Sequence, residues 1–134
     1  MDPRPDGGAW KGFASMNFIE EWGFNVKVGQ EEAFQQWVTA NEERLKQSSP
    51  KGSEYVGIYA VIYTTEKHSG QFRLLVRHDT YADLDTAAAA GKDAKSEFGR
   101  LSREFIKFID PASTADWSRS LLKSIVEATV FKSG

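Results

Sequence analysis

The stretch from Tyr55 to Asp79 constrains the fold of this chain more than any other part. It holds two runs rich in β-branched and aromatic residues, separated by the polar segment TTEKHSGQ, with Gly70 near its end. Two such runs around a short polar segment with a glycine are typical of a β-hairpin. The sequence therefore predicts two antiparallel strands, over 55–64 and 71–78.

The residues before the hairpin predict one strand and one helix. Apolar side chains occupy alternate positions over 18–28, with Glu20 as the exception, and this period of two indicates a strand. In the next segment, QEEAFQQWVTANEERLKQSS, apolar residues recur at helical spacing. Pro50 and Gly52 follow this segment and are expected to end the helix.

The residues after the hairpin predict mainly helices and then a last strand. Thr80 and Asp83 have the spacing of a helix-capping pair, with Asp in place of the usual Glu. The expected elements are helices over 81–90, 92–110 and 113–123 and a strand over 125–131.

This order of elements defines the expected fold class. Strand, helix, strand, strand, helices and strand form the βαββαβ pattern of the ferredoxin-like α+β fold. Its sheet has four antiparallel strands in the order 4-1-3-2, with the helices on one face. We expect a single domain over 18–134, preceded by a flexible arm over 1–17 that is rich in proline and glycine.

Composition excludes several classes of function. The chain has 134 residues, a formal net charge of −2 and no cysteine. This charge argues against nucleic-acid or anionic-membrane partners, and the lack of cysteine fits a reducing, cytoplasmic location. No run approaches the roughly 18 apolar residues of a membrane span, and the N-terminal segment lacks the apolar stretch of a secretory signal, so we do not expect it to act as one. Two histidines without cysteine form no metal-ligand set, and nucleotide-binding motifs are absent, so we expect no metal and no cofactor.

The side of the sheet that the helices do not cover is expected to be mixed in character. Tyrosines and arginines are enriched at the centres of interfaces, so we expect this face to pack on a second copy in a homodimer. A solvated sheet face is the alternative. Arg73 and Arg77 on this face could also bind an anionic substrate, or pair across the sheet with Glu21 or Glu127. The residues of the expected dimer face are Tyr55, Tyr59, Tyr63, Arg73 and Arg77.

Glu20 and His78 are the sharpest candidates for chemistry. Both interrupt an otherwise apolar face, and the predicted topology brings them to the same end of the helix-covered side. A carboxylate beside an imidazole orients the ring, which is how a general base is commonly arranged. Trp22 follows on the same face, and Trp37 and Phe105 are expected to line a pocket or fill the core. The alternative for Glu20 and His78 is a buried structural pair.

The order of elements and the run VKVGQEEAFQQW, which leads from the first strand into the first helix, resemble the dimeric α/β-barrel superfamily. Antibiotic-biosynthesis-monooxygenase-like and stress-responsive barrel proteins belong to it. Many relatives have proline before the glycine, where this chain has Val28. The resemblance implies sheet-to-sheet dimers and a ligand cavity between sheet and helices. The superfamily includes cofactor-free oxygenases, haem-degrading enzymes and isomerase-like enzymes, so membership constrains the fold far more than the chemistry.

Two functions remain open from the sequence. The first is a small-molecule-binding protein or a cofactor-independent, oxygenase- or isomerase-like enzyme that acts on a small, largely apolar ligand. His78 would then be the base or hydrogen-bond donor, Glu20 would orient it and Trp22 would form the wall. The second is a non-catalytic dimeric interaction domain with a filled core. A cavity beside His78 distinguishes the two.

Overall fold

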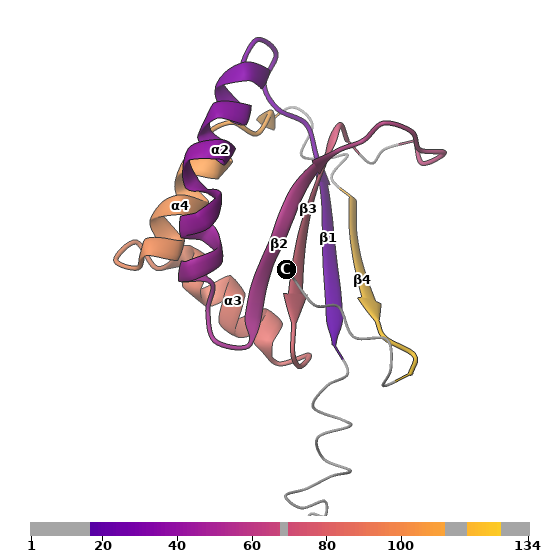
Figure 1. Cartoon of the computed structure of the whole chain (residues 1–134), viewed down its shortest axis with the longest axis vertical. Helices are drawn as coiled ribbons and strands as arrows, with labels where there is room; N and C mark the ends of the chain where they lie inside the picture. Colours follow the sequence, from indigo (N-terminus) through magenta and orange to yellow (C-terminus); the bar gives the residue numbers. More distant parts are fainter. Residues whose placement is uncertain (1–16, 68–69, 112–117, 127–134) are drawn as a thin grey trace, which may run out of the picture.

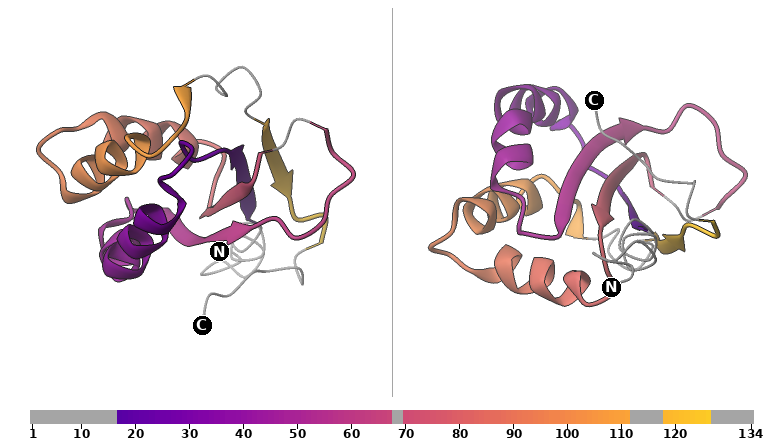
Figure 2. Two further views of the ribbon diagram at one scale, coloured as in Figure 1. Left: turned by 90° about the horizontal axis from the view of Figure 1, so that it is seen from above. Right: turned by 60° about the horizontal axis from the view of Figure 1, so that its bottom comes forward.

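The computed structural model describes residues 17–67, 70–111 and 118–126. The elements are β1 (Phe18–Phe24), α2 (Glu31–Ser48), β2 (Ser53–Ala60), β3 (Phe72–His78), α3 (Asp83–Lys92), α4 (Glu97–Ile106) and β4 (Ser118–Lys123). The strands form one antiparallel sheet in the order β2-β3-β1-β4. All three helices lie on one side of this sheet (Figures 1 and 2).

This arrangement confirms the predicted ferredoxin-like α+β fold and its strand order. The predicted arm over 1–17 lies outside the described residues, apart from Asn17. In the part of the chain that the structure describes, no helix is both long enough and apolar enough to cross a membrane.

The last strand is not where the sequence predicted it. Ser118–Lys123, expected as the second half of a helix over 113–123, is strand β4 and pairs with β1. Ile125 and Val126, expected to begin a strand over 125–131, are exposed and lie outside any strand, and the rest of that range is outside the described residues. β4 is an exposed edge strand with mixed side chains, so it has no apolar alternation to mark it.

Strand β2 contains a β-bulge that reverses its faces. Tyr55 pairs with Val76, but Gly57 pairs with Leu75, so one extra residue lies between the two pairs. A glycine inside a strand is a common sign of a bulge. Tyr55 therefore lies on the helix-covered face. The strict alternation of the sequence had placed it on the open face, and this prediction was wrong.

Tyr55 belongs to the core instead. Its side chain is 3% exposed and packs with Leu45 of α2 and Leu101 of α4. β2 ends at Ala60 and not at 64, so Tyr63 lies beyond the strand and is exposed. A second buried cluster fills the other end of the helix–sheet layer and consists of Phe24, Val26, Phe34 and Ile109.

The segment predicted as one helix over 92–110 is interrupted before α4. The Ser96 hydroxyl accepts a hydrogen bond from the Gly99 N–H and so caps the new helix. A side chain at Gly99 would collide with the Asp93 carbonyl, so glycine allows this close turn. The capping pair before α3 forms as predicted: the Thr80 N–H donates to Asp83 and the Asp83 N–H donates to the Thr80 hydroxyl.

Candidate functional site

A line of four polar side chains crosses the helix-covered face of the sheet at one end, and each strand contributes one of them. Ser53 comes from β2, His78 from β3, Glu20 from β1 and Arg119 from β4. Ser53 Oγ lies 2.7 Å from His78 Nδ1, and His78 Nε2 lies 3.0 Å from Glu20 Oε1. The Arg119 guanidinium binds the other carboxylate oxygen of Glu20 at 2.7 Å. The contact between Glu20 and His78 predicted from sequence is therefore present.

Hydrogen-bonding capacity sets the direction of this chain of contacts. An ionised Glu20 can only accept, so His78 Nε2 carries a hydrogen and donates a hydrogen bond to the carboxylate. In a neutral imidazole with this tautomer, Nδ1 accepts a hydrogen bond from the Ser53 hydroxyl. The imidazole is 1% exposed, so both of its nitrogens are occupied in a buried position.

Two opposing effects act on the pKa of Glu20. Burial desolvates the carboxylate and by itself would raise the pKa, but the hydrogen bonds from His78 and Arg119 outweigh it. The pKa of Glu20 therefore lies below its ordinary value of 4.5. The carboxylate is therefore ionised at neutral pH and can accept the hydrogen bond from His78 Nε2.

Arg119 completes the line at its outer end. Its guanidinium lies 4.9 Å from the centre of the Trp22 ring, in a cation–π contact. About half of the Arg119 side chain is exposed, whereas Glu20 is buried. The line thus runs from the buried layer to the surface at β4.

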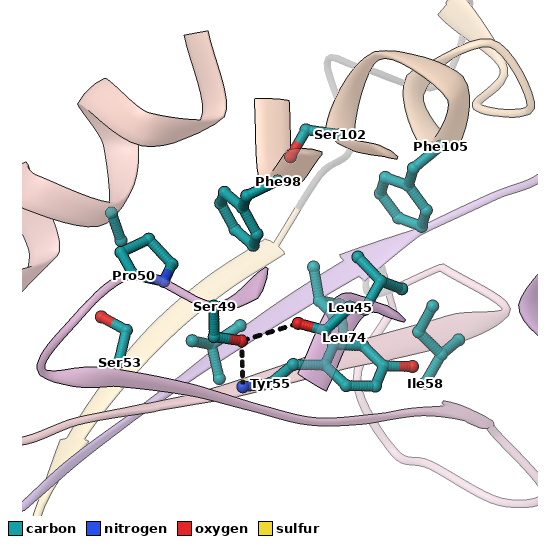
Figure 3. Close-up of a pocket in the computed structure, with 12 residues that line it drawn as sticks. Leu45, Ser49, Pro50, Ser53, Tyr55, Ile58, Leu74, Phe98, Ser102 and Phe105 are labelled. Carbon is teal, nitrogen blue, oxygen red and sulfur yellow. Dashed lines mark hydrogen bonds between the residues drawn. The ribbon is translucent and has the colours of Figure 1, made fainter. Parts of the chain in front are cut away.

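Two adjoining cavities lie between the sheet and helices α3 and α4. The first has a volume of about 70 Å³ and an almost wholly apolar wall, with Ser53 at one side (Figure 3). The second, of about 300 Å³, is bordered by Glu20, Trp22, His78 and Arg119. The two cavities share Leu74, Val76, Ala87, Phe98, Ser102 and Phe105.

The structure separates the three aromatic residues expected in the pocket. Trp22 borders the second cavity and Phe105 borders both, so the space beside His78 is not filled by them. Trp37 borders neither cavity, contrary to the expectation. Its indole N–H donates to Glu104 at 2.8 Å, and its ring packs on Phe105 and Phe108, because it lies on the rim of α2 that faces α4.

On the open face, the arginines pair with acids across the strands. Arg73 binds Glu21 at 3.0 Å and Glu66 at 3.2 Å. Arg77 binds Glu54 at 3.0 Å and also contacts Asp79. This is the structural pairing that the sequence offered as an alternative to substrate binding, with Glu21 among the expected partners.

Ser53 and Arg119 are members of the line that sequence reasoning missed. Ser53 lies opposite His78 only through the pairing register of β2 and β3, and no periodicity indicates a hydroxyl. Arg119 was placed in a helix. Within the described ranges, no three His, Asp or Glu side chains gather into a metal-ligating group.

Comparison with known proteins supports the fold. No protein-family model matches this sequence, and no curated protein is significantly similar to it. A NIPSNAP family protein of unknown function from Agrobacterium tumefaciens superposes with a TM-score of 0.58 at 13% identity, over 86% of this chain and 94% of that one.

Two further solved structures are similar. One is provisionally described as an antibiotic biosynthesis monooxygenase, from Bordetella bronchiseptica (TM-score 0.54, 14% identity, 84% of this chain and 99% of that one). The other is a Dabb family protein with a ferredoxin-like fold from Mesorhizobium loti (TM-score 0.50, 9% identity, 82% and 96%). At these identities the similarity shows the fold alone, which is the ferredoxin-like fold that the sequence predicted.

The lowered pKa of Glu20 makes a prediction about stability. We expect Glu20→Gln to lower the free energy of unfolding by about 1–3 kcal/mol near neutral pH, because the substitution weakens two charge-assisted hydrogen bonds. Since the pKa is lower in the folded state, this stabilisation is present above 4.5 and is lost as the pH falls through the folded-state pKa. Urea unfolding of both proteins across this pH range measures the difference.

Glu32→Gln, at an exposed position of α2, is the matched control and should stay within about 0.5 kcal/mol of the unsubstituted protein at every pH. A difference between the unsubstituted protein and Glu20→Gln that does not change with pH would show that the carboxylate charge is not what stabilises the site.

Proposed function

We propose that this protein binds a small, largely apolar molecule between its sheet and helices α3 and α4, and acts on it by proton transfer to His78 without a metal or nucleotide cofactor. The observation that carries this proposal is the hydrogen-bonded line from Ser53 through His78 to Glu20 beside two cavities. Apolar cavities with a few convergent polar groups are the usual form of small-molecule sites.

His78, with Glu20 as its partner, has the features of a general base. Nδ1 of His78 lies within hydrogen-bonding distance of the hydroxyl of Ser53, a residue that borders the first cavity. When the imidazole takes up a proton, the ionised Glu20 stabilises the positive charge that forms. Removal of a proton is the first step expected of cofactor-independent oxygenase- or isomerase-like chemistry, and one of the similar structures is provisionally described as a monooxygenase.

A specific observation favours the non-catalytic alternative. Both nitrogens of His78 are engaged and its ring is 1% exposed, as in a pair that only holds strands together. In that case the protein would be an interaction domain, and its cavities would not bind small molecules. A cytoplasmic location, expected from the lack of cysteine, stays a prediction under either function.

Binding in the cavities is tested with a substitution that fills them. Ala87 of α3 borders both cavities, so Ala87→Trp should lower the affinity for a small aromatic probe by about tenfold or more. Fluorobenzene, observed by ¹⁹F NMR during titration with protein, is a suitable probe. Ala89→Trp, at an exposed position of the same helix, should leave the affinity unchanged. Equal binding to both variants would place the probe outside the cavities.

We also propose that a second copy of this chain covers the open face of the sheet. The helices cover one side only, and the other side presents Tyr59, which is 52% exposed, and Leu122, which is 54% exposed. These apolar groups lie among the paired charges of Arg73 and Arg77, as in an interface with a mixed centre. Packing of this face would bury both.

Sedimentation equilibrium measures the assembly state. We expect the unsubstituted protein to be a dimer and Leu122→Asp to be a monomer, because the charge would be buried without a partner. Val28→Asp, at a 92% exposed position before α2, is the control and should remain dimeric. A monomeric unsubstituted protein would leave the open face without this partner.

A further inference from the structure

The imidazole of His78 is almost wholly buried, and His78 borders the second cavity but not the first. Nε2 donates to Glu20, Nδ1 accepts from Ser53, and the ring is 1% exposed. A molecule in the first cavity would meet Ser53, which borders that cavity (Figure 3), and the Ser53 hydroxyl is hydrogen-bonded to His78 Nδ1. For a ligand in the first cavity, the nearer of the two candidate reactive groups is therefore the serine, with the imidazole as its hydrogen-bond partner.

We infer that Ser53 is a nucleophile, activated by His78 and Glu20, that accepts the acyl group of a small ester with an apolar acid part. This inference rests on the proposed function, because it uses the same cavity and the same base. It adds a residue that contacts the substrate and a substrate class, carbonyl compounds that carry a leaving group.

The geometry matches the general signature of an activated nucleophile. That signature is a nucleophile within hydrogen-bonding reach of a base, with the base oriented by a third group. Here the distances are 2.7 Å from Ser53 Oγ to Nδ1 and 3.0 Å from Nε2 to Glu20. The two ring nitrogens are exchanged relative to the common serine triad. Either nitrogen can serve as the base, since the carboxylate decides which one stays unprotonated.

Ser53 is also held in place by the surrounding backbone. Its N–H donates to the Pro50 carbonyl at 2.9 Å, and the Gly52 carbonyl accepts from the Asp79 N–H at 2.8 Å. Gly52 has a φ of +89°, and a side chain there would collide with Asp83. This tight turn fixes the start of β2 against β3 and so directs the hydroxyl to the imidazole.

Other hydroxyl groups at the first cavity are differently engaged. Ser49 donates to the Leu45 carbonyl and accepts from the Tyr55 N–H. The Tyr55 hydroxyl donates to Glu42. Ser102 borders both cavities but is not a hydrogen-bond partner of His78. Among these residues, Ser53 is thus the one whose hydroxyl is hydrogen-bonded to a base. The volume of the first cavity, about 70 Å³, restricts the acyl group to a small one.

Transfer of the acyl group to Ser53 and its later release require no reagent other than water. Ser53 Oγ forms a bond to the carbonyl carbon while its proton passes to His78 Nδ1. The bond from that carbon to the leaving oxygen breaks, and the leaving oxygen takes the proton from Nδ1. Water, deprotonated by the same nitrogen, then cleaves the ester on Ser53 and returns the hydroxyl. No oxidation or reduction takes place, and Glu20 stays ionised throughout.

Methanesulfonyl fluoride tests the inference directly, because it is small enough for the first cavity, forms a stable bond to an activated serine and releases fluoride. We expect the intact mass of the full-length protein to increase by one methanesulfonyl group, located on Ser53 by peptide mapping. Ser53→Ala should not be labelled. His78→Gln should be labelled at least about 100-fold more slowly, as expected on loss of a general base. Thr86→Ala, which removes an exposed hydroxyl of α3 that borders neither cavity, should be labelled at the original rate.

Fluorobenzene binding, measured on the same samples, separates this inference from the proposed function and shows that each variant is folded. If the unsubstituted protein binds fluorobenzene but Ser53 is not labelled, the inference is wrong and the proposed binding function stands. If label persists in Ser53→Ala, or peptide mapping places the label on another residue, the nucleophile is not Ser53. If neither binding nor labelling occurs, both proposals are wrong.

Discussion

The pairing of the buried Glu20 carboxylate with His78 and Arg119 is the interaction on which this end of the sheet depends. A charge that is removed from water requires close partners, since an unpaired one is strongly destabilising. Its partners come from the two neighbouring strands, His78 of β3 on one side and Arg119 of β4 on the other. One charge in the central strand β1 therefore links three strands, and Ser53 extends the link to the fourth.

The helices leave space beside this line. At the other end of the layer, Phe24, Phe34, Phe72 and Phe105 pack ring against ring and fill the core. Beside His78 the covering helix is α3, whose Ala87 and Ala88 are too small to fill the gap to the sheet. Large side chains at one end and small ones at the other thus give a close-packed core and a cavity in the same layer.

Much of this arrangement could be predicted from the sequence because it depends on local periodicity. The alternation in β1 and β3 fixes which side Glu20 and His78 occupy, and the order of elements fixes which strands are neighbours. Tyr55 was misplaced because a single bulge residue reverses the faces of a strand, and only the pairing register shows where it lies. The glycine at position 57 was the available signal.

Arg119 and Ser53 could not have been found in the same way. β4 pairs with β1 through its backbone, and its Arg119 forms an ion pair with Glu20. Its side chains are mostly exposed and therefore show no apolar period. Ser53 is significant only because the turn before β2 places it opposite His78. Trp37 was expected at the pocket because the apolar face of a helix spans a wide arc, and its position on that arc depends on where α4 packs.

The tautomer of His78 is the measurement that tests this account most directly. In protein labelled with ¹⁵N at histidine, the His78 signals can be assigned by comparison with His78→Gln and observed near neutral pH. Hydrogen bonding to an ionised Glu20 predicts a protonated Nε2 and an unprotonated Nδ1, and Glu20→Gln should disturb this preference. A proton on Nδ1, or rapid exchange between both tautomers in the unsubstituted protein, would show that Glu20 does not fix the ring and that Ser53 has no base.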